Sequence, residues 1–368
     1  MIPVSEPLLD ERALSNVNEA LRTGWISSEG RFIAEFEHSW AEYCGVAHGV
    51  AVCSGTAALE LAMAALALPA GSEIILPSFT IISCAAAVLR TGCCPVLVDC
   101  EPDTWCLDVT EVRRKITDKT RAVMPVHIYG HMADMDPLIK LASEFDLAII
   151  EDAAEAHGAE YHQHRAGGMG TIGCFSFYAN KIVTTGEGGM VVTNDAKLAE
   201  HARSLRNLAF RRDQRFLHTE IGYNFRMTNL QAAIGLAQIE RIEDHLKRKR
   251  RVAAHYRERL SKIEGLRLPV ERPNVKNVYW MYGIVLEDSI SIDAATLGAR
   301  LREHGVDSRP FFLGMHEQPS LRRRGLFAGE TYPVTERLAR RGLYLPSGLG
   351  IAEAEIDSVC LAVKRCLI

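Results

Sequence analysis

The chain has 368 residues, of which 48% are apolar and 24% are charged, and its formal net charge is −4 at pH 7. This composition is typical of a globular protein with a well-packed core, and the length favours two domains. It excludes a disordered or collagen-like chain, and the lack of a basic excess argues against a nucleic-acid partner.

The first 14 residues contain neither a basic segment nor an apolar run, so we expect no signal peptide. The ten cysteines are irregularly spaced and include no Cys-x-x-Cys pair, which favours reduced thiols and a cytoplasmic protein. Residues 51–70 are the strongest candidate for a membrane span, but they include Glu60 and a Ser-Gly-Thr segment near their start. We therefore expect a buried helix there and no membrane partner.

From residue 50 onward, short unbroken apolar runs alternate with helix-length segments. The runs predicted as strands are residues 73–76, 95–99, 121–126, 147–150, 174–178 and 190–193. The predicted helices are residues 57–68, 80–89, 137–144 and 196–207. This alternation is typical of buried parallel strands joined by crossover helices. It predicts an α/β fold with a mostly parallel sheet flanked by helices.

The pattern changes after residue 228. Residues 228–262 contain few helix breakers and become highly charged after Gln238, so we predict one long helix that links two domains. The expected division is a large domain over residues 1–240 and a smaller C-terminal α/β domain over residues 241–368. Within the smaller domain we predict a strand at 281–286 and helices at 294–304 and 332–341.

Five consecutive cations occupy residues 247–251. Such a run can bind nucleic acid or act as a localisation signal. The alternative is a solvated helix face, balanced by Glu240, Glu243 and Asp244 one turn earlier. We favour the solvated face because the chain as a whole is acidic.

Ligands of open α/β sheets bind beyond the carboxyl ends of the strands. Glu151, Asp152 and Glu155 follow the predicted strand 147–150. Such carboxylates can hold a metal, but no His or Cys lies at tight ligand spacing, so we expect no metal site. A carboxylate at this position can instead pair with the cationic ring nitrogen of a cofactor.

Lys181 follows the predicted strand 174–178 and precedes a Gly-rich segment, residues 184–189. The alternative is an ordinary surface lysine, but at the mouth of a sheet its amine can be desolvated and can form a Schiff base. Ser54-Gly55-Thr56 opens a predicted helix, whose N-terminus favours a phosphate. Pyridoxal 5′-phosphate (PLP) needs a phosphate site, an anion for its ring nitrogen and an amine.

Eight short motifs spread along the chain resemble those of one known family. They are Gly24-Trp25-Ile26-Ser27-Ser28, Ser54-Gly55-Thr56-Ala57-Ala58-Leu59, Pro77-Ser78-Phe79-Thr80, Pro125-Val126-His127-Ile128-Tyr129-Gly130, Glu151-Asp152-Ala153-Ala154-Glu155, Phe175-Ser176-Phe177-Tyr178-Ala179-Asn180-Lys181, Thr185-Gly186-Glu187-Gly188-Gly189-Met190 and Gly222-Tyr223-Asn224-Phe225-Arg226-Met227. The resemblance is to the DegT/DnrJ/EryC1/StrS sugar aminotransferases and covers nearly the whole chain. It implies the fold-type-I, aspartate aminotransferase-like architecture of PLP-dependent enzymes.

The resemblance also implies roles for individual residues. Lys181 matches the lysine that holds the cofactor and moves the proton, and Asp152 matches the carboxylate that keeps the ring nitrogen protonated. Glu155 stands beside the cofactor's phenolic oxygen, where many relatives have Gln. The residues that match phosphate ligands are Gly55, Thr56, Ser176 and, from a neighbouring subunit, Asn224, which implies a homodimer with shared active sites. Those expected near the sugar nucleotide are Trp25, Ser27 and His316.

One position departs from the family pattern. Relatives usually carry an aromatic residue directly after Pro-Ser-x-Thr, stacked on the cofactor ring, whereas this chain has Ile81. An aliphatic side chain can cover the ring, but without the aromatic contribution of about 0.5–1.5 kcal/mol.

Within the family, three features resemble those of enzymes that convert GDP-4-keto-6-deoxymannose to GDP-perosamine with L-glutamate as amino donor. They are the run Ile182–Met190 after the lysine, Glu155 where many relatives have Gln, and Ser308-Arg309-Pro310 with Met315-His316. Three alternatives remain for the substrate. They are a sugar linked to UDP or dTDP, a sugar aminated at carbon 3, and a cyclic ketone that carries no nucleotide. Sugar dehydratases of the family replace the lysine with His, so Lys181 argues against dehydration. A non-catalytic regulatory member is a further alternative, which the pair of Lys181 and Asp152 disfavours.

Overall fold

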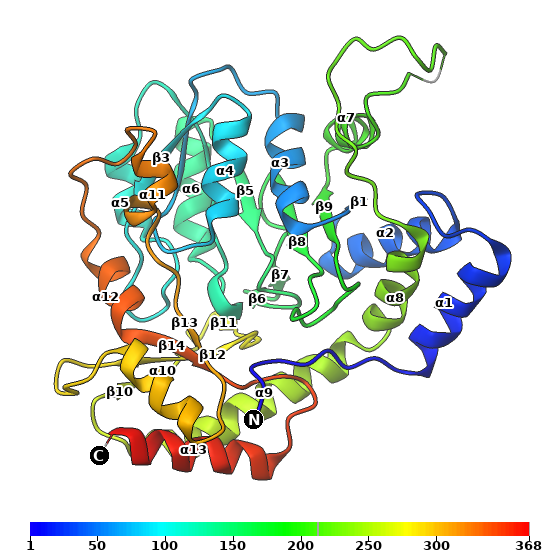
Figure 1. Ribbon diagram of the computed structural model, residues 1–368. Helices are drawn as coiled ribbons and strands as arrows, with labels where there is room; N and C mark the ends of the chain where they lie inside the picture. The colour runs from blue at the N-terminus through cyan, green and yellow to red at the C-terminus, as the bar shows by residue number, and fades with distance from the viewer. Residues whose placement is uncertain (212, 368) are drawn as a thin grey trace.

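The computed structural model describes residues 1–211 and 213–367. In this part of the chain a seven-stranded sheet has the order β1-β9-β8-β5-β4-β2-β3 (Figure 1). Its strands are β1 (His48–Val52), β2 (Glu73–Pro77), β3 (Cys94–Val98), β4 (Thr120–Val123), β5 (Ala148–Asp152), β8 (Ile172–Ser176) and β9 (Gly189–Thr193). The pairs from β8 to β3 are parallel, whereas β9 is antiparallel to both β8 and β1. The predicted, mostly parallel sheet is therefore confirmed.

The helices of residues 1–211 are α1 (Glu11–Thr23), α2 (Arg31–Cys44), α3 (Gly55–Ala65), α4 (Ile82–Arg90), α5 (Val109–Lys115), α6 (Met135–Phe145) and α7 (Ala196–Arg206). The alternating pattern predicted α3, α4, α6 and α7, each of which packs on strands of the large sheet. The central helix α3 packs on β8 and β9 and lies between α4 and α7. Nearly all of its residues are buried, which explains its Ala-rich sequence. Helices α1, α2 and α5 and strand β1 were not predicted from the sequence.

The predicted helix over residues 228–262 is two helices, α8 (Asn229–Ile239) and α9 (Ile242–Leu260). A capping box between Thr228 and Gln231 starts α8. The helix breaks at Arg241, whose φ of −117° and ψ of 11° are not helical. Its guanidinium donates to Asp10 Oδ2 at 3.0 Å. The prediction of one helix was wrong because a tertiary ion pair, rather than Gly or Pro, accompanies the break.

The C-terminal part contains an antiparallel sheet of order β10-β12-β14-β13. Its elements are β10 (Leu266–Arg267), β12 (Tyr282–Leu286), β13 (Arg309–Pro310), β14 (Gly342–Leu345), α10 (Ala294–Glu303), α12 (Pro333–Arg341) and α13 (Glu353–Leu367). The predicted strand and two helices correspond to β12, α10 and α12, while α13 was not predicted. This sheet, with α9, α10 and α13, forms a second hydrophobic core (Figure 1).

The remaining elements are short. They are β6 (Glu160–Tyr161), β7 (His164–Arg165), β11 (Val275–Lys276), α11 (Pro319–Arg322) and the 3₁₀ turns η1 (Ile128–Gly130) and η2 (Met315–Glu317). Met315 and neighbouring apolar residues of the C-terminal part belong to the core of the large sheet, and the Met315 N–H donates to the Ser78 carbonyl at 2.8 Å. The C-terminal third of the chain thus contributes to both cores.

The five cations at residues 247–251 lie in α9 but do not share one exposed face. Lys247 and Arg251 are exposed, whereas Lys249 is buried and its ammonium donates to the Ser347 carbonyl. Burial lowers the pKa of Lys249 to about 7. The solvated-face interpretation is therefore wrong for Lys249, because the helical period turns this residue inward.

In the described part of the chain, no helix has both the length and the apolar character needed to cross a membrane.

Candidate active site

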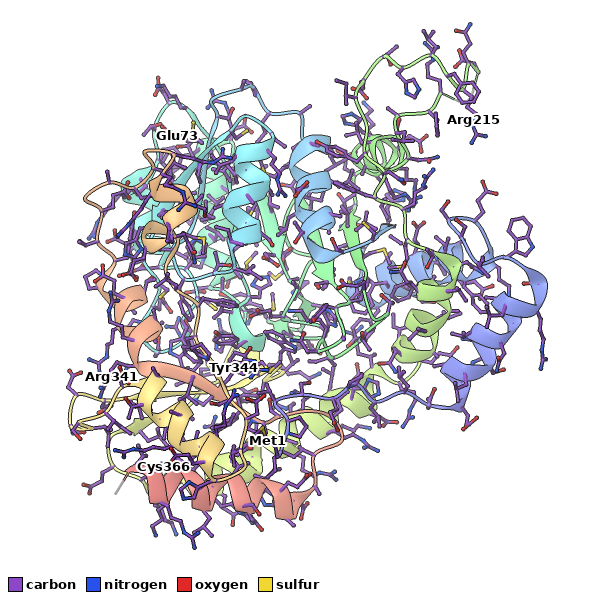
Figure 2. The ribbon with its side chains drawn as sticks, in the orientation of Figure 1. Met1, Glu73, Arg215, Arg341, Tyr344 and Cys366 are labelled. Carbon is purple, nitrogen blue, oxygen red and sulfur yellow. The ribbon has the colours of Figure 1, made fainter. Side chains whose placement is uncertain are left out.

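A cavity of about 330 Å³ lies at the carboxyl ends of β5 and β8. Seven residues that the sequence predicted for a cofactor site line it, namely Gly55, Thr56, Ile81, Asp152, Glu155, Ser176 and Lys181. The C-terminal part closes the cavity with three aromatic residues, Trp280, Phe312 and Tyr344. Tyr344 lies where the C-terminal sheet faces the large sheet (Figure 2). The cavity is therefore built from both parts of the chain.

Lys181 lies in the turn that follows β8, and its backbone N–H donates to the Tyr178 carbonyl at 2.9 Å. Its side chain is 10% exposed, and Nζ lies 4.0 Å from Glu155 Oε1. Nζ also lies 3.7 Å from the ring centroid of Trp280. Burial lowers the pKa of Lys181, and the negative charges of Glu155 and Asp152 oppose this shift. The amine is thus desolvated and held beside two carboxylates.

Two carboxylates face this amine from β5 and the loop after it. Glu155 Oε2 accepts a hydrogen bond from the Tyr129 N–H at 2.8 Å, and burial raises the pKa of Glu155. Asp152 ends β5, where Oδ1 accepts from the Ala154 N–H and Oδ2 from the Cys84 thiol, both at 3.1 Å. The strand therefore fixes one carboxylate and the loop positions the other.

The N-terminus of α3 forms the opposite wall of the cavity. Ser54 caps the helix, its Oγ accepting from the Ala57 N–H at 3.1 Å. A Cβ added at Gly55 would lie 2.5 Å from Ser176 Cβ, so glycine is what allows the helix start to approach the end of β8. Thr56 Oγ1 lies 2.9 Å from Ser83 Oγ. Backbone N–H groups and hydroxyls converge here, which is the donor set that a phosphate requires.

These residues fit PLP. The N-terminus of α3 with Thr56 and Ser176 supplies phosphate donors, Asp152 supplies an anion and Lys181 supplies a desolvated amine, all on the lining of one cavity. Ile81 also lines this cavity and is 45% exposed. Its place on the wall makes it available to cover the cofactor ring, without an aromatic face.

The aromatic residues that complete the cavity were not predicted from the sequence. Trp280, Phe312 and Tyr344 belong to the C-terminal third, far along the chain from Lys181. The one signal was the Tyr279-Trp280 pair directly before the predicted strand 281–286. Nothing in the sequence links this pair to the large sheet.

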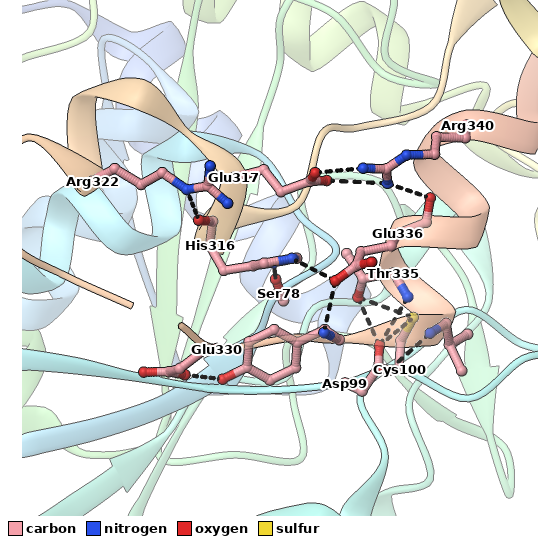
Figure 3. Close-up of polar contacts among 12 residues, drawn as sticks. Ser78, Asp99, Cys100, His316, Glu317, Arg322, Glu330, Thr335, Glu336 and Arg340 are labelled. Carbon is pink, nitrogen blue, oxygen red and sulfur yellow. Dashed lines mark hydrogen bonds and ion pairs between the residues drawn. The ribbon is translucent and has the colours of Figure 1, made fainter. Parts of the chain in front are cut away.

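The structure places His316 outside the lining of this cavity. Its buried ring lies in the network shown in Figure 3, with Nδ1 2.8 Å from Ser78 Oγ and Nε2 3.2 Å from Glu336 Oε1. Its carbonyl accepts from Arg322 at 2.7 Å. Through these hydrogen bonds His316 links α12 to the end of β2. Ser78 is followed closely by Thr80 and Ile81, which line the cavity.

Trp25 and Ser27 line a different hollow, of about 370 Å³, together with Arg215 and Arg226. Asn224 is not on the lining of the Lys181 cavity, and its Oδ1 accepts from Arg226 at 2.6 Å. Arg215 lies on a loop between α7 and α8 that projects from the body of the molecule (Figure 2). One chain therefore does not bring these residues to Lys181.

Comparison with known proteins gives the family. The profile described as the DegT/DnrJ/EryC1/StrS aminotransferase family matches residues 7–364. The chain is 43% identical to the GDP-perosamine synthase of Caulobacter vibrioides, with 100% of this chain and 98% of that protein covered. It is 37% identical to the GDP-perosamine synthase of Escherichia coli O157:H7, with coverage of 99% and 98%.

A solved structure supports the same assignment. The crystal structure of DesI in the presence of its TDP-sugar product superposes with a TM-score of 0.91 at 33% identity, and covers 100% of this chain and 93% of that one. The fold-type-I architecture expected from the sequence is thereby confirmed. With a family profile over almost the full length, full-length relatives above 30% identity and the same fold, the chain belongs to the DegT/DnrJ/EryC1/StrS aminotransferase family.

Proposed function

We propose that this protein is a PLP-dependent aminotransferase that converts GDP-4-keto-6-deoxymannose to GDP-perosamine, with L-glutamate as amino donor. The observation that carries the proposal is the buried amine of Lys181, which lies in one cavity with Asp152 and the N-terminus of α3. The choice of sugar nucleotide rests on the full-length similarity to proteins named GDP-perosamine synthase.

The residues of the cavity would have different roles in an amino transfer. When bound, PLP supplies an aldehyde carbon for the amino group and a protonated ring that accepts electrons. Gly55, Thr56 and Ser176 would hold its phosphate, and Asp152 would hold the proton on the ring nitrogen. Glu155 would lie beside its phenolic oxygen.

Lys181 is the acid–base group in this proposal. Burial lowers its pKa and so favours the neutral form of the free amine. In the half-reaction with glutamate, neutral Nζ would take the proton from the α-carbon of the donor. In the separate half-reaction with the keto sugar, the protonated amine would deliver a proton to carbon 4 of the sugar. The nucleotide supplies binding energy away from the reacting carbon and orients the carbonyl.

The proposal is tested with purified protein, PLP, glutamate and a panel of GDP-, UDP- and dTDP-linked keto sugars. We expect the GDP-linked 4-keto-6-deoxy sugar to give the highest kcat/KM, with product identified by mass and the amino position by NMR. Preference for a dTDP-linked sugar would favour the alternative represented by DesI. No amino sugar from any substrate would favour a non-catalytic role.

A further inference from the structure

Trp280 makes two contacts with the lysine segment of the cavity. The face of its indole lies 3.7 Å from Lys181 Nζ, measured to the ring centroid. Its Nε1–H donates to the carbonyl of Asn180 at 2.8 Å. Trp280 is 5% exposed, so both contacts lie in a largely desolvated environment. One side chain from the C-terminal part therefore contacts both the reactive amine and the backbone beside it.

The turn η1 holds Trp280 in place. The Val278 N–H donates to the Gly130 carbonyl at 3.1 Å. A Cβ at Gly130 would lie 2.8 Å from the backbone nitrogen of Trp280, so the two backbones approach too closely for any other residue. The Tyr129 ring stacks on Trp280, with centroids 6.2 Å apart and planes at 27°. Because the Tyr129 N–H also binds Glu155, η1 positions both neighbours of the amine.

The electrostatic effects on the amine have opposite signs. Burial favours the neutral form, while Glu155 and Asp152 favour the ammonium. His157 also faces the lysine, but burial lowers its pKa to about 3, so it is neutral. The negative face of an indole attracts a cation and adds to the effect of the carboxylates. Because the contact is within 4 Å and shielded from water, it affects the amine whenever the amine is free.

We propose that Trp280 is a positioning residue for Lys181, in which the indole face stabilises the ammonium and the indole N–H fixes the Asn180 carbonyl. This proposal rests on the proposed function in one respect, namely that Lys181 is the acid–base group. The contacts themselves occur in the chain without cofactor, so they can be tested independently of turnover.

The test measures the amine of Lys181 directly. The full-length protein, freed of PLP, is trace-labelled with acetic anhydride over a pH series, and the peptide that contains Lys181 is quantified by mass spectrometry. The midpoint of labelling against pH reports stabilisation of the ammonium, and the plateau at high pH reports access to the amine. The variants are Trp280→Phe, which keeps an aromatic face but loses the N–H, and Trp280→Leu, which loses both. Trp280→Met replaces the Leu variant if thermal unfolding shows that it does not fold.

We expect Trp280→Leu or Trp280→Met to lower the labelling midpoint. At a fixed pH below the wild-type midpoint, the extent of labelling should then rise roughly two- to thirtyfold, which corresponds to the free energy of a buried cation–π contact. Trp280→Phe keeps most of the wild-type midpoint but raises the plateau. The control is Phe145→Leu, which removes a partly exposed aromatic ring of α6 that is not on the lining of the cavity and leaves the midpoint in place.

If the labelling midpoint is unchanged in the Leu or Met variant, the proposal is overturned. It is also overturned if Trp280→Phe shifts the midpoint as much as the Leu or Met variant does, since the cause would then be packing and not the aromatic face. A merely structural role would lower the melting temperature and raise the plateau without moving the midpoint. Because the readout needs no substrate, failure here leaves the proposed aminotransferase activity standing. Failure of that activity likewise leaves the Lys181–Trp280 contact testable.

Discussion

At the scale of single residues, the proposed function assigns Lys181 two roles, those of nucleophile and acid–base group. We expect Lys181→Ala and Lys181→His to lose amino-sugar formation by several orders of magnitude, because both roles are removed together. Borohydride reduction of the wild type with PLP should leave the cofactor on the peptide that contains Lys181. The control is Lys140→Ala, an exposed lysine of α6, which should retain activity and labelling. Near-normal turnover by Lys181→His would show that another residue is the base.

His131 gives a pH-dependent prediction at the same scale. Its Nδ1–H donates to the Met132 carbonyl at 2.7 Å, and burial together with Arg272 lowers its pKa to about 4. The folded state therefore binds fewer protons than the unfolded state, and the stability present above about pH 6.5 is lost as the pH falls toward 4. The loss from this one residue is on the order of 3 kcal/mol.

His131→Gln removes the titrating group and should flatten this dependence. The measurement is the free energy of unfolding by urea at several pH values between neutral and mildly acidic. His38→Gln serves as the control, because His38 is largely exposed. An identical pH slope for wild type and His131→Gln would contradict the prediction.

At the scale of elements, the cofactor site depends on the close approach of α3 to β8. Gly55→Ala introduces a Cβ 2.5 Å from Ser176 Cβ, so the helix start and the strand end must separate. We expect weaker PLP binding, measured by absorbance titration, because the phosphate donors no longer converge. Gly350→Ala is the matched control, since a Cβ there meets no atom within 4 Å. Equal PLP affinity in both variants would show that Gly55 does not shape the phosphate site.

At the scale of the whole molecule, the placement of Asn224 provides a test of the expected homodimer with shared active sites. In one chain Asn224 binds Arg226 and is absent from the lining of the Lys181 cavity. If it binds phosphate, it does so in the partner's cavity. A hybrid of Lys181→Ala and Asn224→Ala chains would then contain one intact site, and random mixing of equal amounts should restore about a quarter of wild-type activity.

The control for this prediction is each variant treated alone in the same way. Subunit exchange is verified by mass spectrometry of differently tagged chains. Activity that stays at the level of the separate variants after verified exchange would rule out a site shared through Asn224.

The sequence by itself determined the α/β class, the parallel strands and the candidate cofactor-binding segments near the carboxyl ends of β5 and β8. These features follow from local pattern, because a strand buried on both faces requires an unbroken apolar run and each motif spans only a few residues. Asp152, Ser176 and Lys181 are close in the chain, so their strands bring them to one edge of the sheet.

Tertiary structure alone decided the break at Arg241, the burial of Lys249, the place of His316 and the contact of Trp280 with Lys181. Each depends on a partner far along the chain, namely Asp10, Ser347, Ser78 and Lys181 respectively. Hydrophobic periodicity does not predict which residues far apart in the chain come into contact. The sequence therefore specified the chemistry on the large sheet, and the packing of the C-terminal part against that sheet decided how its lysine is enclosed.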